Sequence, residues 1–332
     1  MPEATTDKTN SPRASTPART GRRSRRWLVF VAIGALLLGG AAFLRHYYLS
    51  APPVGKGPAG PAVPREPFQK TWSTRQVLFL GLGDSITVGF GAPPGHGAFD
   101  RLVRNPPNEF PEMQGLCLSA VYPNLEAKNL AQTATNSIQH AEDQIPALQE
   151  QPPDVFGLVM ITTGGNDLIH SYGRRPPVEG AMYGASLEQA RPWIEAFEKR
   201  LDGMLAAIQE RFPGGCEIFL ANIYDPTDGA GTGVLIVIPS WPDSVAILRA
   251  YNEVIARCAQ RRPGVHLVDI HSAFLGHGLQ CNRFWTRYYC RSDPSFWYYQ
   301  NIEDPNDRGY DALRRLFLIE ISKVLARPDS AK

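Results

Sequence analysis

Short apolar runs alternate with longer amphipathic segments over most of the chain, from about residue 71 onward. The apolar runs indicate strands over residues 76–81, 126–130, 155–162, 217–222 and 265–270. Apolar residues at helical spacing predict helices over residues 137–150, 187–212, 243–261 and 310–325. Strands with few charges are typical of a sheet buried on both faces, and their alternation with helices favours parallel pairing through right-handed crossovers. The pattern therefore predicts an α/β fold with a doubly wound, parallel, five-stranded sheet.

The N-terminal part of the chain does not follow this pattern. Residues 1–26 are rich in Thr, Ser, Pro and Arg, so we expect a disordered basic tail. An uncharged apolar run follows, about as long as a helix that crosses a bilayer, and we expect a transmembrane anchor over residues 27–48. The preceding arginines mark the cytoplasmic side, which places the rest of the chain outside the cytoplasm, in a periplasm or at the cell surface. A cleaved signal peptide is the alternative.

The domain boundaries follow from this division. Residues 49–70 are rich in Pro and Gly and are expected to form an extended linker that spaces the domain from the membrane. A folded domain is expected over residues 71–328. The chain has a formal net charge of +2, and much of its positive charge lies in the basic tail. The folded part is therefore not basic, and we expect no nucleic-acid partner.

The five cysteines stand at positions 117, 216, 258, 281 and 290, and none shows a zinc-binding spacing. Metal-ligand clusters and phosphate-binding loops are likewise absent from the sequence, so we expect no metal and no cofactor. In an exported domain Cys281 could pair with Cys290 and Cys216 with Cys258. Free buried thiols are the alternative.

Chemistry-bearing residues follow the first and third expected strands. Gly83-Asp84-Ser85 ends the first strand, where flanking glycines permit a tight turn that exposes the Ser85 hydroxyl. Gly164-Gly165-Asn166-Asp167 follows the third strand, and the Asn166 amide could donate a hydrogen bond to a developing oxyanion. Capping of the helices that follow is the alternative role for both side chains.

In this order, the segments 83–87, 129–137 and 164–167 resemble the SGNH/GDSL hydrolase family. The resemblance covers residues 75 to 325 or so and implies a flavodoxin-like sheet with the strand order 2-1-3-4-5. It also implies a serine esterase, lipase or carbohydrate acylesterase.

Particular roles come with this resemblance. It implies that Ser85 is the nucleophile, that Asn166 is a side-chain oxyanion donor, and that the backbone N–H groups of Ser85 and Ala134 are the other donors. The family usually has Gly at the position of Ala134, so this donor requires a backbone conformation that Ala can adopt. We expect Asp84 and Gly165 to line the substrate site.

The C-terminal motif departs from the family pattern. The family has D-x-x-H-P-N before the last helix, where this chain has Asn301 in place of the Asp and Asp304 in place of the His. A serine hydroxyl needs a base within hydrogen-bond reach. The first candidate is His277, with Asp304 orienting its imidazole; the second is His271, also expected near the substrate. Asp304 with a raised pKa is a third candidate, and loss of hydrolysis is the fourth possibility.

The sequence therefore predicts a membrane-anchored, extracytoplasmic serine hydrolase that cleaves an ester of a carbohydrate or lipid through an acyl-Ser85 intermediate. The alternatives are acyl transfer to a cell-surface glycan and a non-catalytic glycan-binding protein that kept the fold. Residues 91–115 are expected to form a loop over the site. The aromatic segment 275–300 could hold sugar rings or an acyl chain, or pack the last helix.

Overall fold

The computed structural model describes residues 21–46, 51–234 and 238–326. The chain divides after Ala51 into two compact units. In the first unit, helix α1 (Gly21–Leu44) contains a window, Arg26–Leu44, that is long and apolar enough to cross a membrane. A signal sequence meets the same criteria, so α1 is a candidate span. Residues 1–20 of the expected tail, and 47–48 of the expected anchor, lie outside the described residues.

Within the described part of the second unit, five strands form one parallel sheet in the order β2-β1-β3-β4-β5. They are β1 (Gln76–Gly83), β2 (Leu125–Asn129), β3 (Val155–Thr162), β4 (Cys216–Ala221) and β5 (Val265–Val268). The predicted fold class and strand order are confirmed. Gly83, at the end of β1, pairs in register with Thr162 at the end of β3. The segments that follow these strands therefore leave the sheet side by side, at the edge where open α/β sheets bind ligands.

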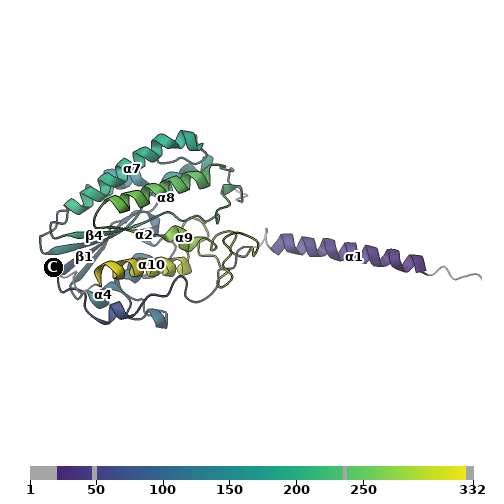
Figure 1. The fold of residues 1–332 in the computed structure, drawn as a ribbon, viewed down its shortest axis with the longest axis horizontal. Helices are drawn as coiled ribbons and strands as arrows, with labels where there is room; N and C mark the ends of the chain where they lie inside the picture. Colours follow the sequence, from purple (N-terminus) through teal and green to yellow (C-terminus); the bar gives the residue numbers. More distant parts are fainter. Residues whose placement is uncertain (1–20, 47–50, 235–237, 327–332) are drawn as a thin grey trace, which may run out of the picture. The chain divides into compact units, whose positions relative to one another are not determined.

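Helices cover both faces of this sheet (Figure 1). On one face lie α7 (Leu187–Glu210) and α8 (Ser244–Arg261), and their rings Phe197 and Tyr251 stack with centres 4.3 Å apart. On the other face lie α3 (Ala98–Val103) and α10 (Asp307–Leu325). The remaining α-helices are short: α2 (Ser85–Val88), α4 (Leu118–Val121), α5 (Ser137–Gln139), α6 (Gly165–Ile169) and α9 (Ile270–Phe274). Short 3₁₀ helices cover Glu66–Gln69, Pro111–Met113, His170–Gly173 and Thr232–Val234.

Two helices differ from the sequence-based expectation. The helix expected over 137–150 ends as α-helix at Gln139, and a π-helical turn follows over His140–Gln144. Pro146 contributes to this early end, because it has no N–H to donate and its ring excludes the carbonyl group of the preceding turn. Helix α10 begins three residues before the expected start, since the Asn306 side chain accepts a hydrogen bond from Gly309 N and caps it.

The Pro/Gly-rich residues 52–63, called the strap here, belong to the second unit and pack on α10. Ala59 and Val63 are buried, and the Ala59 N–H donates to Asp311 Oδ2 at 3.0 Å. Gly60 has a φ of +85°, and a Cβ there would lie 2.9 Å from the Cα of Ala312. The Pro and Gly content that predicts a spacer linker therefore allows this segment to pack closely on α10. The boundary expected at residue 71 falls inside the folded unit.

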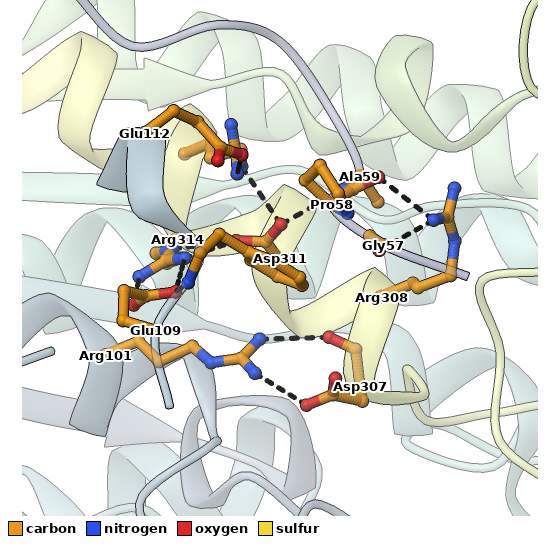
Figure 2. A network of polar contacts seen from close by, with 12 residues as sticks. Gly57, Pro58, Ala59, Arg101, Glu109, Glu112, Asp307, Arg308, Asp311 and Arg314 are labelled. Atoms are coloured by element: carbon orange, nitrogen blue, oxygen red, sulfur yellow. Dashed lines mark hydrogen bonds and ion pairs between the residues drawn. The ribbon is translucent and has the colours of Figure 1, made fainter. Parts of the chain in front are cut away.

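A network of buried charges joins α10 to the preceding loops (Figure 2). Arg314 is fully buried and binds both Glu109 and Asp311 through its guanidinium group. Arg101 likewise binds Asp307, the first residue of α10. Burying charges costs desolvation energy, which each ion pair offsets only while both partners are present. The network therefore fixes the position of α10 more strictly than apolar packing alone would.

All five cysteines lie in the described ranges, and all are free thiols. Neither of the two pairings considered from the sequence forms. Burial raises the pKa of the Cys281 thiol to about 12, so this thiol is un-ionised near neutral pH and unreactive.

Candidate active site

Ser85 stands on a sharp turn between β1 and α2. Gly83 has a φ of +110°, and a Cβ there would lie 1.8 Å from the carbonyl oxygen of Thr162. Asp84 accepts hydrogen bonds from Ile86 N at 3.1 Å and Thr162 Oγ1 at 2.7 Å, which caps α2. The turn therefore requires glycine at 83 and places the Ser85 side chain, half-buried, in a cavity.

Asp84 is buried next to other acids. Burial raises the pKa of its carboxyl group to about 6, with further upward contributions from the charges of Asp304 and Asp167. The hydrogen bonds from Thr162 and Ile86 act in the opposite direction. Asp84 also lines the cavity, but both of its bonded partners belong to the frame of the turn. Its contacts are those of a residue that positions Ser85.

Asn166 is brought to the same cavity as Ser85. Gly164 has a φ of +95° and turns the chain into α6, so that Gly165 and Asn166 both line the cavity wall. The Asn166 amide Nδ2 donates to the carbonyl oxygen of Thr135 at 2.8 Å. One amide hydrogen fixes the side chain in this way, and the other is left to donate to a substrate oxygen.

Ala134 immediately precedes the residue that holds Asn166. It is exposed, and its φ of +62° lies in the left-handed region. The backbone at this position therefore has a conformation that glycine adopts freely, at a cost for alanine of about 1 kcal/mol. This φ suits glycine better than alanine, and Ala134 is not among the described residues that line the cavity containing Ser85.

A buried polar network below these turns was not anticipated from the sequence. Gln144 accepts from Gly83 N at 2.9 Å and donates to Gly83 O at 2.8 Å. His140 joins Thr135 Oγ1 at 2.9 Å to Thr163 Oγ1 at 2.8 Å. Burial lowers the pKa of His140 to about 4, so its imidazole is neutral and serves as a structural link. In the sequence, His140 and Gln144 look like ordinary polar positions of the helix expected over 137–150, so nothing there indicated that they support the turns.

Asp304 lies against Ser85, on a turn that precedes α10. The Ser85 hydroxyl is close enough to the Asp304 carboxyl group to lower its pKa by hydrogen bonding, and Asn301 Nδ2 donates to Asp304 Oδ2 at 2.6 Å. Asp304 is only 3% exposed. Burial raises its pKa, while the hydrogen bonds from Ser85 and Asn301 lower it. Asn301 and Ser85 therefore both act on the Asp304 carboxyl group.

The turn that carries Asp304 is strained. Ile302 has a φ of +67°, a left-handed conformation that is unfavourable for a β-branched residue. The turn is closed by a bridge between Tyr298 and Pro305 and by the bond from Tyr299 N to Asp304 O at 2.7 Å. Such strain costs on the order of 1–3 kcal/mol and persists only where the surroundings hold it.

Neither histidine expected as the base is brought to Ser85. The His277 ring stacks on Trp297 with centres 3.5 Å apart, and its Nδ1 lies 3.1 Å from the carbonyl oxygen of Ser295. Asp228 draws the loop to this place by accepting from Gly276 N and Gly278 N. Asp304 does not orient the imidazole, because its hydrogen bonds come from Ser85 and Asn301.

His271 likewise contacts another part of the chain. Its Nδ1 lies 2.9 Å from the carbonyl oxygen of Ile223. Among the described residues, neither His271 nor His277 lines the cavity that contains Ser85. The expectation that His271 contacts substrate is therefore not supported by its position.

The cavity at Ser85 has a volume of about 310 Å³. Its lining is mostly apolar and includes Leu168, Ile169, Tyr172, Tyr183, Ile223, Ile238, Trp241, Val245 and Leu248, with Arg174, Asp225, Thr227, Thr232 and Ser244 among the polar lining residues. Glu303 lies at the polar end beside Asp304; burial and the Asp304 charge raise its pKa to about 7. Among the described lining residues none comes from 91–115 or 275–300. Of the alternatives for the aromatic segment, packing holds for Phe296, Trp297 and Tyr298, which are buried in the core beneath α10.

A family model of GDSL-like lipases and acylhydrolases matches residues 82–312. The chain belongs to this family. The matched GDSL-like region runs from the end of β1 into α10 and contains Ser85, Asn166 and Asp304. No curated protein sequence is significantly similar to the chain.

Solved structures to which the chain is similar include a G-D-S-L family protein, a phospholipase and an esterase. A member of the lipolytic G-D-S-L family from Veillonella parvula is 14% identical, with 76% of this chain and 99% of that chain covered and a TM-score of 0.43. Phospholipase A1 from Streptomyces albidoflavus is 17% identical (74% and 98% covered, TM-score 0.43). The acetylxylan esterase Axe2 from Geobacillus stearothermophilus, in a catalytic mutant, is 19% identical (76% and 96% covered, TM-score 0.43).

Proposed function

We propose that this GDSL-family protein is a serine esterase in which Ser85 is the nucleophile and Asp304 is the general base. The observation that carries this proposal is the place of the Asp304 carboxyl group, which Asn301 holds through a hydrogen bond and whose pKa the nearby Ser85 hydroxyl lowers. A carboxylate in contact with the serine hydroxyl is in position to take its proton. This contact favours a working hydrolase over a glycan-binding protein that has lost its base.

The two departures from the family motif compensate each other. In the pattern D-x-x-H, the carboxylate accepts a hydrogen bond from the imidazole, and the imidazole accepts the serine proton. Here the amide of Asn301 donates, and the carboxylate of Asp304 accepts the proton. An Asp at both positions would place two carboxyl groups in contact and strongly raise the pKa of one. With Asn301 the pair keeps a single negative charge, on the residue that touches Ser85.

The proposed reaction proceeds in two halves. The Ser85 Oγ bonds to the ester carbonyl carbon as its proton passes to Asp304, and the resulting oxyanion accepts hydrogen bonds from Asn166 Nδ2 and the N–H groups of Ser85 and Ala134. When the intermediate collapses, the bond to the leaving oxygen breaks and the alcohol takes the proton from Asp304. Water then attacks the acyl-serine and gives a proton to Asp304. Release of the carboxylic acid returns that proton to Ser85.

The apolar wall of the cavity supports an ester with an extended acyl chain as the substrate. An acetyl group would leave the lining residues Ile169, Trp241 and Leu248 without contacts to the substrate, whereas a longer acyl chain would cover them. Each buried methylene contributes up to about 0.8 kcal/mol, or roughly fourfold in binding of the transition state. The acyl group is therefore proposed to be longer than acetyl.

The membrane location belongs to the same proposal. The apolar window of α1 supports an anchor, and the arginines before it support a cytoplasmic N-terminus with the catalytic domain on the other side. Extraction of membranes with alkaline carbonate should leave the full chain in the pellet. Protease added outside spheroplasts should then degrade the catalytic domain.

Active-serine labelling tests the chemistry directly. The full chain in detergent should react with a fluorophosphonate probe and hydrolyse p-nitrophenyl butyrate, and Ser85→Ala should abolish both. Absence of labelling in the wild type, or equal labelling of Ser85→Ala, would refute the proposed function.

A further inference from the structure

The strap contacts the chain on both sides of the turn that carries Asp304. Before the turn, Phe296 N donates to Pro53 O at 2.7 Å. After the turn, Arg308 Nη1 donates to the carbonyl oxygens of Lys56, Gly57 and Pro58 at 2.7, 2.7 and 3.0 Å, as Figure 2 shows in part. The strap therefore joins the two ends of the segment in which the base lies.

Arg308 holds both the strap and the aromatic segment. Its Nη2 donates to Asp293 Oδ2 at 2.5 Å, and its side chain is only 8% exposed. A guanidinium group bound to several carbonyl oxygens and a carboxylate is fixed in direction, because its planar donors cannot turn independently. Arg308 thus links two segments of the chain, the strap and the aromatic segment, to the first turn of α10.

The strap approaches this region too closely for any residue except glycine at two points. At Gly55, which has a φ of +74°, a Cβ would lie 2.7 Å from the Cβ of Ser295. At Gly60 it would meet the backbone of α10 at Ala312. Contact at backbone distance leaves little room for the strap to move without displacing what it touches.

Short hydrogen-bonded steps lead from these contacts to the base. Asn306 Nδ2 donates to Phe296 O at 2.7 Å, and Asn306 N donates to Trp297 O at 2.9 Å. Pro305 then bridges to Tyr298, and Asp304 O accepts from the N–H of Tyr299. The two strands of this small frame enclose Ile302, whose left-handed backbone needs such support.

We infer that the strap is part of the catalytic apparatus, and that Arg308 is the positioning residue through which it holds Asp304 against Ser85. The inference rests on the proposed function, since it assigns a role behind the proposed base. The strap then supports catalysis in addition to being part of the segment that connects α1 to the rest of the chain. A strap that only adds stability would leave the catalytic rate of folded molecules unchanged.

The experiment compares Arg308→Ala and Arg308→Lys in the full chain with a matched control, Arg75→Ala. Arg75 also donates from Nη2 to a backbone carbonyl oxygen, that of Gly214 at 2.8 Å, but at the opposite end of the sheet. Hydrogen exchange of residues 299–306 reports the hold on the turn. The kcat and KM for p-nitrophenyl butyrate, with the pH profile of kcat, report its effect on the base.

Arg308→Ala should raise the exchange rate over 299–306 at least several-fold. Its kcat per folded molecule should fall about 10- to 100-fold, because a displacement of about 1 Å at a reacting group costs up to that much. KM should stay within about twofold, the pH profile of kcat should shift, and Arg308→Lys should recover part of the rate. Arg75→Ala should change none of these in its folded fraction.

If folded Arg308→Ala has the same hydrogen-exchange rate over residues 299–306 and the same kcat as the wild type, the inference is overturned. If this variant does not fold, Gly55→Ala perturbs the strap with a single methyl group and should show the same loss of kcat at wild-type KM; wild-type kcat in that variant would overturn the inference as well. A wild type without esterase activity refutes the proposed function. The exchange comparison would even then decide whether the strap holds the turn.

Discussion

Replacing Asp304 with Asn removes the proposed base and keeps the shape of the side chain. The Asn301 amide N–H can still donate a hydrogen bond to the side-chain oxygen of the Asn introduced at 304, so the turn should remain folded. Removal of a general base typically costs 10²–10⁴-fold in rate, or about 2.7–5.5 kcal/mol in the activation free energy. Because Asp304 is only 3% exposed, a buffer base has little access to the position that the missing carboxylate occupied. We therefore expect kcat to fall about 10³-fold in Asp304→Asn.

The assay is steady-state hydrolysis of p-nitrophenyl butyrate, together with the rate of fluorophosphonate labelling of Ser85. Asp269→Asn is the matched control, because Asp269 also accepts a hydrogen bond from an asparagine, Asn222 Nδ2 at 2.7 Å, but serves as the cap of α9. It should keep at least half of the wild-type kcat. If Asp304→Asn kept as much while Ser85→Ala was inactive, another group would be the base and the reasoning would be refuted.

Three other changes test separate parts of the structure. In Glu303→Gln a carboxyl group whose pKa is raised to about 7 is replaced by a neutral amide; because Glu303 is already protonated in the pH range where Asp304 titrates, the acidic limb of kcat/KM against pH should stay in place, and a shift of that limb to lower pH would show that Glu303 is charged there. In Leu248→Phe the apolar wall is filled, so kcat/KM for p-nitrophenyl octanoate should fall more than that for the acetate; equal losses would argue against an acyl-chain site. In Glu109→Ala the buried guanidinium of Arg314 loses a partner, and urea titration should show a loss of about 3 kcal/mol in the free energy of unfolding. A loss under 1 kcal/mol would show that Asp311 alone satisfies Arg314.

Ser85 and Asn166 could be found from the sequence because their placement is local. Gly83 ends β1 and Gly164 follows β3, each in a backbone conformation that glycine favours, and the side chain two residues later is directed by that turn. The five strands were legible for the same reason, since buried parallel strands are continuous apolar runs. Among the main elements the helix over 137–150 was the most overextended, because its polar residues bind the turns at Gly83 and Thr135 and do not face solvent.

The base could not be found in this way because it depends on long-range folding. His277 and Asp304 both follow β5, and either could reach Ser85 along the chain. Their positions are decided by Asp228, which binds the loop around His277, and by Trp297, which stacks on its ring. The strap posed the same difficulty: Pro and Gly occur both in mobile linkers and in segments packed at backbone distance, and only the partner surface on α10 distinguishes the two.

The contact between Asn301 and Asp304 also makes the order of substitution matter for any route between this site and the family motif. Changing Asn301 to Asp first would place two carboxyl groups about 2.6 Å apart, and they would share one proton near neutral pH. Changing Asp304 to His first would leave a neutral imidazole beside an amide, which can turn its oxygen to accept the ring N–H. The route that changes Asp304 to His first keeps a usable base at every step. The route that changes Asn301 to Asp first passes through an intermediate with two carboxyl groups in contact, which is electrostatically unfavourable.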